Sequence, residues 1–114
     1  MAGGFAMGAD RWRVRPVRPG DSRLVDGQGR RTLAVTDPET MCVYVSTALR
    51  GDMLDRVLAH ELTHCAMLSY DLAADVRRMV RPDHWREAEE WAANLVADYA
   101  PSILQDAHDI AGRW

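Results

Sequence analysis

Residues 52–69 of this chain read DMLDRVLAHELTHCAMLS. Apolar residues recur there every three or four positions, which is the period of an amphipathic α-helix. The apolar face consists of Leu54, Val57, Leu58, Leu62, Cys65 and Leu68. Asp52 is a suitable N-cap, and Asp55 follows in the first turn, where acidic residues are favoured. The segment therefore predicts a helix from Asp52 to Ser69 that packs one face on a core.

Two histidines at the edge of this apolar face have the spacing of a metal site. His60 and His64 are one helical turn apart, so their rings lie on one side of the helix, about 40° apart. Two imidazoles in that arrangement can bind one tetrahedral zinc ion. Glu61 points about 80–100° away from them and can take a proton from a zinc-bound water. The pattern HExxH thus predicts His60 and His64 as zinc ligands and Glu61 as general base.

A third protein ligand has to come from another part of the chain, because catalytic zinc sites commonly have three. The metzincin continuation is excluded, since Met67 and Tyr70 occupy the positions that would need Gly and His. A second helix is predicted from Asp83, as N-cap, to Ala100, with Pro101 ending it. It offers the candidate ligands Glu90, Glu89, Glu87 and His84.

Part of this second helix is similar to a known family. Residues 90–97, EWAANLVA, resemble the ExxAN-x-apolar-A segment of ImmA/IrrE-type and other minimal gluzincin peptidases. In those peptidases a Glu on a second helix completes the zinc site, and a polar residue four positions later braces a ligand His. The resemblance spans residues 41–101 and implies Glu90 as third ligand and Asn94 as the brace. The residues themselves leave Glu89 and Glu87 open as alternatives.

The order of the predicted elements indicates the fold class. Residues 1–10 are rich in Gly and Ala and are expected to be mobile. Strands are predicted at residues 11–18, where Pro16 favours a sheet edge, at 31–36 and at 41–46. Further helices are expected at 72–80 and 102–110. Strands followed by helices predict an α+β fold in one domain, residues 1–114, with a small antiparallel sheet. The resemblance implies that the two helices form a zincin-like pair.

Aromatic and polar residues outside the motif carry weaker expectations. Trp85, Trp91 and Tyr99 fall at helical spacing and are expected to pack in the core. Candidates for stabilising an oxyanion are Tyr70, His84, Tyr99 and His108.

Composition and charge exclude several other classes of protein. The net charge is −3, and the chain has 14 basic residues, 17 acidic residues and two cysteines that form no CxxC pair. The N-terminus lacks the pattern of a signal peptide, and no apolar run is long enough to span a membrane. We therefore expect a cytoplasmic protein that binds neither membrane nor nucleic acid.

Two functions agree with these features. The first is a zinc-dependent metallopeptidase with Zn2+ on His60, His64 and Glu90, acting on a peptide or protein substrate, with a protein partner possible. By resemblance, extended substrate would pair with the strand at Val43–Ser46. The alternative is a non-catalytic zinc-containing assembly or binding protein that keeps the fold. Proteins resembling this chain often occur with phages and mobile elements. A groove over the metal favours the enzyme, whereas a closed four-ligand site favours the alternative.

Overall fold

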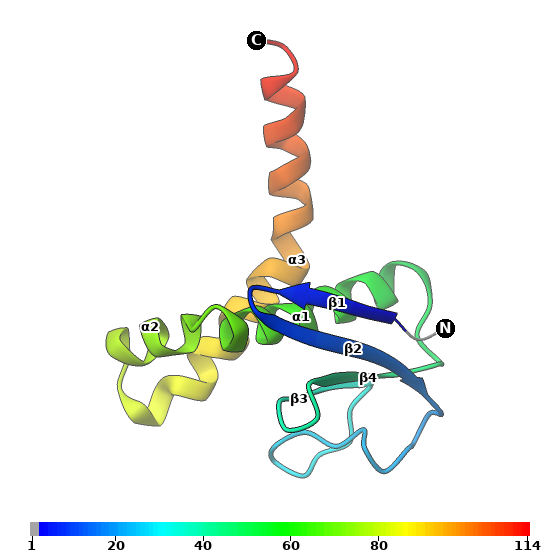
Figure 1. Ribbon diagram of the computed structural model, residues 1–114. Coiled ribbons are helices and arrows are strands. Elements are labelled where there is room, and N and C mark those ends of the chain that lie inside the picture. Colours follow the sequence, from blue (N-terminus) through cyan, green and yellow to red (C-terminus); the bar gives the residue numbers. More distant parts are fainter. Residues whose placement is uncertain (1–2) are drawn as a thin grey trace.

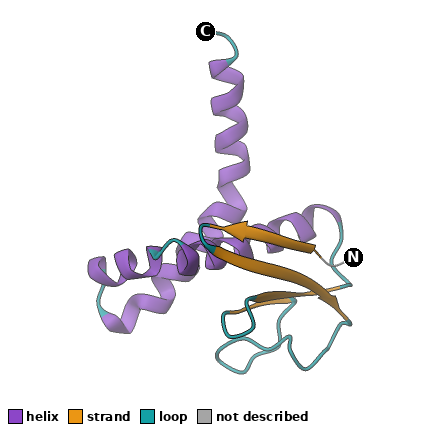
Figure 2. Ribbon diagram, in the orientation of Figure 1, coloured by secondary structure: helices purple, strands orange, loops and turns teal. Residues whose placement is uncertain are grey.

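A computed structural model describes residues 3–114, and within them a four-stranded sheet is followed by three α-helices (Figure 1). The strands are β1 (Gly3–Met7), β2 (Asp10–Val17), β3 (Ala34–Asp37) and β4 (Cys42–Ser46). The helices are α1 (Gly51–Ser69), α2 (Leu72–Met79) and α3 (Trp85–Ala111), with a 3-10 turn, η1 (Pro82–His84), before α3. Figure 2 shows the strands as one group, with α1 running along the sheet. The predicted α+β class is confirmed.

The sheet is mixed, and the expectation of an antiparallel sheet is wrong in one pairing. The strand order is β1-β2-β4-β3. The pairs β1–β2 and β3–β4 are antiparallel, but β2 and β4 are parallel. The reason is the loop at residues 18–33, which carries the chain past β2 before β3 begins. The chain then turns at residues 38–41 and inserts β4 between β2 and β3.

Strand β4 is the centre of the sheet and is buried along its whole length. Its alternate side chains point to opposite faces, as in any strand. Val43 packs with Trp12 and Cys65 on the α1 side. Tyr44 packs with Leu24 on the other side, where the loop at residues 18–33 covers the sheet. Both faces of β4 are therefore apolar, which explains why this segment is a continuous run of strand-forming residues.

The N-terminal strands differ from expectation in two ways. Residues 3–7 form β1, from Gly3 paired with Val14 to Met7 paired with Asp10, so the expectation of a mobile segment over 1–10 does not agree with this pairing. Residues 1–2 lie outside the described residues. Pro16 lies in an internal strand, but β1 ends opposite Val14. Among residues 3–114, the one strand residue that pairs with Pro16 is Val45 of β4, so no described strand calls for the missing N–H on its other side.

The predicted helix ends hold for α1 and α2 within one or two residues, but not for α3. Helix α1 begins at Gly51, so Asp52 lies in its first turn and does not cap it. Helix α3 continues through Pro101 to Ala111, so the expected break and the separate helix at 102–110 are wrong. Proline has a helical φ and removes only one hydrogen bond. Every residue from 101 to 114 is exposed, so a bend at Pro101 disturbs no packing.

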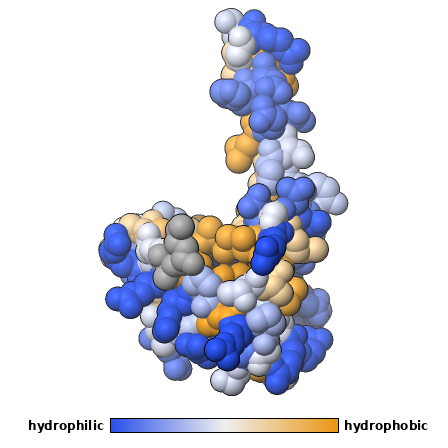
Figure 3. Space-filling view, turned by 90° about the vertical axis from the view of Figure 1, so that its right-hand side faces the viewer, coloured by the Kyte–Doolittle hydropathy of each residue, from blue (hydrophilic) through white to orange (hydrophobic). Residues whose placement is uncertain are grey.

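The C-terminal part of α3 projects away from the rest of the chain (Figure 1). In Figure 3, hydrophilic side chains predominate on the visible face of this projection, and hydrophobic ones gather on the body below it. Trp91 and Tyr99 are 67% and 61% exposed, so their predicted place in the core is wrong. The face of α3 that packs inward carries Ala93 and Ala97, and positions two residues away from these alanines point outward.

The packing of α3 on α1 brings the candidate site together. Ala93 is fully buried and Ala97 nearly so, and such small side chains let two helix axes approach closely. An ion pair between Arg56 of α1 and Asp98 of α3 lies at one end of this contact. Within residues 3–114, no helix combines the length and apolar character needed to cross a lipid bilayer.

One hydrogen bond joins β2 to the end of α1 and gives a test of the fold. The indole N–H of Trp12, a side chain that is 1% exposed, donates to the hydroxyl of Ser69 at 2.8 Å. We expect Ser69→Ala to lower the free energy of unfolding by about 1–2 kcal/mol, because the buried N–H loses its partner. Urea denaturation measures this change. Ser102→Ala, at an exposed position on α3, is the control and should change stability far less. Equal effects of the two substitutions would contradict the packing of β2 on α1.

Candidate metal centre

His60 and His64 direct the same ring nitrogen toward one point. Both lie on the inner side of α1 and are partly buried, with side chains 21% and 19% exposed. Their Nε2 atoms are 3.3 Å apart, and the rings meet edge to face with centroids 5.0 Å apart. This is the arrangement that the spacing of four residues on a helix predicts.

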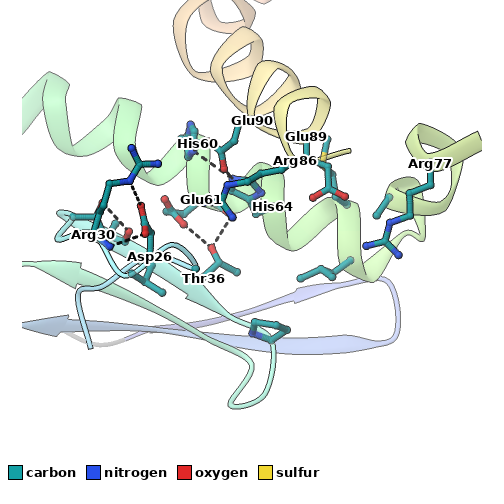
Figure 4. A pocket seen from close by; sticks show the side chains of 18 residues that line it. Asp26, Arg30, Thr36, His60, Glu61, His64, Arg77, Arg86, Glu89 and Glu90 are labelled. Carbon is teal, nitrogen blue, oxygen red and sulfur yellow. Dashed lines mark hydrogen bonds and ion pairs between the residues drawn. The ribbon is translucent and has the colours of Figure 1, made fainter. Parts of the chain in front are cut away.

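Glu90 of α3 faces both histidines across the contact between the helices. Its Oε2 is 3.2 Å from Nε2 of His60, and its Oε1 is 3.1 Å from Nε2 of His64. Figure 4 shows the three side chains pointing toward one another. Among the described residues, they form the one group of three potential metal ligands whose donor atoms all lie within 4.8 Å of one another.

The donor atoms have the spacing that a tetrahedral ion requires. Zinc binds nitrogen and carboxylate oxygen at about 2.0–2.1 Å, so two ligand atoms of a tetrahedron are about 3.3–3.4 Å apart. The separations here are 3.1–3.3 Å. Two imidazoles and a carboxylate are also a donor set found in catalytic zinc sites. The residues therefore fit a divalent cation, with a fourth position left for water or substrate.

The other residues considered as third ligand lie elsewhere. Glu89 lines the same cavity but is not part of the three-residue group. Glu87 is exposed, and its carboxylate is 3.4 Å from Nδ1 of His84, which is itself exposed. The predicted brace Asn94 is exposed, and no hydrogen bond among the described residues joins it to either histidine of α1. The geometry therefore favours Glu90 and gives Asn94 no such role.

Glu61 lies beside this group in a different environment. It is buried, and the hydroxyl of Thr36 on β3 donates to its Oε1 at 2.8 Å. Burial raises the pKa of Glu61 above its ordinary value, whereas the hydrogen bond from Thr36 and the nearby imidazoles act in the opposite direction. A carboxylate with a raised pKa is a stronger base, which suits a residue that accepts a proton during a reaction.

The histidines, Glu61 and Glu90 open onto a cavity of about 550 Å³ (Figure 4). Its walls come from β3, from the loop at residues 26–30 and from all three helices. The donor group lies in the wall of this cavity, so a bound ion would be reachable by a molecule the size of a peptide segment.

The strand that borders the cavity is β3 and not β4. Val43–Ser46, the segment expected to pair with substrate, lies between β2 and β3 and has no free edge, so that expectation is wrong. The N–H of Ser46 donates to the carbonyl of Leu33, so these two residues form a hydrogen-bonded pair of β3 and β4. In an antiparallel ladder every second pair is hydrogen-bonded, and the residues between bonded pairs direct their N–H and C=O groups away from the partner strand. The backbone groups of Ala34 and Thr36 therefore point to the outer edge. Both residues line the cavity.

Two residues of the site were not found from the sequence. Thr36 is 25 positions from Glu61 along the chain, and nothing in a short strand indicates such a contact. Arg86 lines the cavity and precedes Glu90 by one helical turn, a spacing that could have been noticed. The expected oxyanion donors Tyr70, His84, Tyr99 and His108 do not line this cavity.

No known protein family matches the chain, and no curated protein matches it either. The similarity of residues 41–101 to gluzincins therefore stays a prediction that rests on the sequence motifs.

The ligand assignment can be tested by titrating metal-free protein with zinc in a calorimeter. We expect one ion per chain, and at least about a hundredfold weaker binding for His60→Ala, His64→Ala and Glu90→Gln, because each removes one of three ligands. Glu89→Gln is the matched control and should bind like the wild type. If Glu89→Gln loses the metal and Glu90→Gln retains it, the assignment is contradicted.

Proposed function

We propose that this protein is a metal-dependent peptidase, with zinc as the metal. The observation that carries the proposal is the convergence of His60, His64 and Glu90 beside the buried carboxylate of Glu61, at the wall of an open cavity. The resemblance to minimal gluzincins supports the same reading. A bound divalent cation would supply positive charge that makes water more acidic and polarises a carbonyl.

The residues of the chain have separable roles in this proposal. His60, His64 and Glu90 hold the cation. Glu61 accepts a proton from the attacking water and passes it to the leaving amine. Thr36 orients Glu61, because its hydroxyl fixes one carboxylate oxygen at 2.8 Å and leaves the other free.

In this proposal, the substrate binds along the free edge of β3. An extended peptide can add to a free sheet edge through main-chain hydrogen bonds. Ala34 and Thr36 offer such groups at the cavity, and the carboxylate of Glu61 is bonded to the side chain of the same Thr36. A peptide on this edge would therefore run close to the general base.

Two further observations agree with this proposal. One concerns catalysis, and the other concerns the expected location in the cytoplasm. Among the described residues, the donor group contains three ligands and no fourth His, Cys, Asp or Glu, which suits catalysis better than a closed structural site. Cys42 and Cys65 are free and buried, as expected of a protein in the reducing cytoplasm.

The test compares wild type and Glu61→Gln, both loaded with zinc, on a mixed peptide library read by mass spectrometry. We expect both to bind one zinc and only the wild type to cut, with a loss of at least about a hundredfold in Glu61→Gln, because the general base is removed. Glu87→Gln, an exposed position outside the cavity, should cut like the wild type.

Two other results would count against this proposal, the first against the role of Glu61 and the second against peptidase activity. Equal cleavage by wild type and Glu61→Gln would mean that Glu61 is not the base. Zinc binding without any cleavage by the wild type would favour the non-catalytic binding or assembly protein.

A further inference from the structure

Among the described residues, the cavity beside the donor group contains two arginines that form no ion pair with a carboxylate. Three arginines line the cavity, one from each of three segments: Arg30 from the loop at residues 26–30, Arg77 from α2 and Arg86 from α3. Among the described residues, no ion pair includes Arg77 or Arg86, whereas Arg30 pairs with Asp26 at 3.7 Å.

Arg86 is the one of the two unpaired arginines that lies nearest the donor group along the chain. It precedes Glu90 by four residues, so both side chains leave α3 on the same face, about 6 Å apart along the axis. Arg77 instead lies over the ring of Trp85, 5.2 Å from its centroid, at the α2 end of the cavity. In Figure 4, Arg86 extends from α3 into the centre of the cavity.

The loop opposite α3 leaves room for this guanidinium. A Cβ atom built at Gly27 would be 3.3 Å from Nη1 of Arg86, so the glycine allows the two to lie close together. Arg86 therefore spans the cavity from α3 toward the loop at residues 26–30. A substrate lying along β3 and reaching the histidines would pass this guanidinium.

Four acidic residues line the cavity, and three of them have interaction partners other than Arg86. Glu90 faces the histidines, Glu61 accepts from Thr36, and Asp26 accepts from the backbone N–H groups of residues 28 and 30. Glu89 lines the cavity without an ion pair among the described residues. With a divalent cation bound, three arginines and four acids leave the lining with one net positive charge.

We propose that Arg86 binds a carboxylate of the peptide substrate, so that the protein prefers peptides with a negative charge beside the bond it cleaves. A guanidinium forms two parallel hydrogen bonds to a carboxylate, which gives both affinity and orientation. The carboxylate is either an acidic side chain or a free C-terminus. This inference rests on the proposed function, and it makes Arg86 a residue that determines specificity.

Three N-acetylated pentapeptides test the inference by binding alone. They share the frame acetyl-Ala-Ala-Xaa-Ala-Ala: one has Gln and an amidated end, one has Glu and an amidated end, and one has Gln and a free carboxylate. Each is titrated by NMR into Glu61→Gln protein, once with one equivalent of zinc and once with a chelator. We expect at least one acidic peptide to bind about tenfold more tightly than the neutral peptide. The two acidic peptides tell a side-chain carboxylate from a terminal one.

The preference should depend on Arg86 and not on arginine in general. In the same Glu61→Gln background, Arg86→Gln should bind all three peptides within about twofold, and Arg86→Lys should keep part of the preference because it retains the charge. Arg78→Gln is the matched control, since Arg78 pairs with Asp75 outside the cavity, and should keep the full preference.

Several results would overturn the inference. These are equal affinity for the three peptides, no binding of any of them, or an unchanged preference in Arg86→Gln. A preference that needs zinc and survives Arg86→Gln would assign the carboxylate to the metal and not to Arg86. Peptidase activity is judged by a different result. If the wild-type protein cuts no peptide but still prefers acidic peptides in an Arg86-dependent way, the proposed function is contradicted and the carboxylate site stands.

Discussion

The site depends on how closely α3 approaches α1. Two imidazoles one turn apart on α1 form only half of a metal site, and the remaining ligand has to reach them from another element. Ala93 and Ala97 make that approach possible because they place almost no side-chain volume between the helices. Glu90 lies one turn before Asn94 on the same helix, and its carboxylate oxygens are 3.1 and 3.2 Å from the Nε2 atoms of the two histidines. A cation bound there would hold the two helices together and stabilise the fold that creates its site.

The sheet fixes the other side of the cavity. Strand β4, buried on both faces, holds α1 in place through Val43 and its contact with Cys65. Strand β3 pairs with β4 on one side and leaves its other edge at the cavity. The same strand carries Thr36, whose hydroxyl orients Glu61. The proposed substrate-binding edge and the proposed general base are therefore positioned by one strand, so a shift of β3 would disturb both.

The local part of this account was predictable, and the non-local part was not. Helical periodicity gave α1 and the shared face of His60 and His64, because that information lies within one turn. The resemblance pointed to Glu90, which the contact between helices supports. Strand order, the contact of Thr36 with Glu61 and the position of Arg86 depend on how distant segments meet, and no local pattern contains them. Pro101 was expected to end the second helix, but α3 continues through it to Ala111, since proline has a helical φ and removes one main-chain hydrogen bond.

The central claim is that His60, His64 and Glu90 bind one metal ion, and X-ray absorption spectroscopy of the zinc-loaded protein tests it most directly. The account predicts a first shell of nitrogen and oxygen at about 2.0–2.1 Å, with the outer-shell scattering of two imidazole rings and no sulfur. A sulfur shell at about 2.3 Å would assign the metal to cysteine, and a shell of oxygen alone would exclude the histidines. Either result would contradict the account.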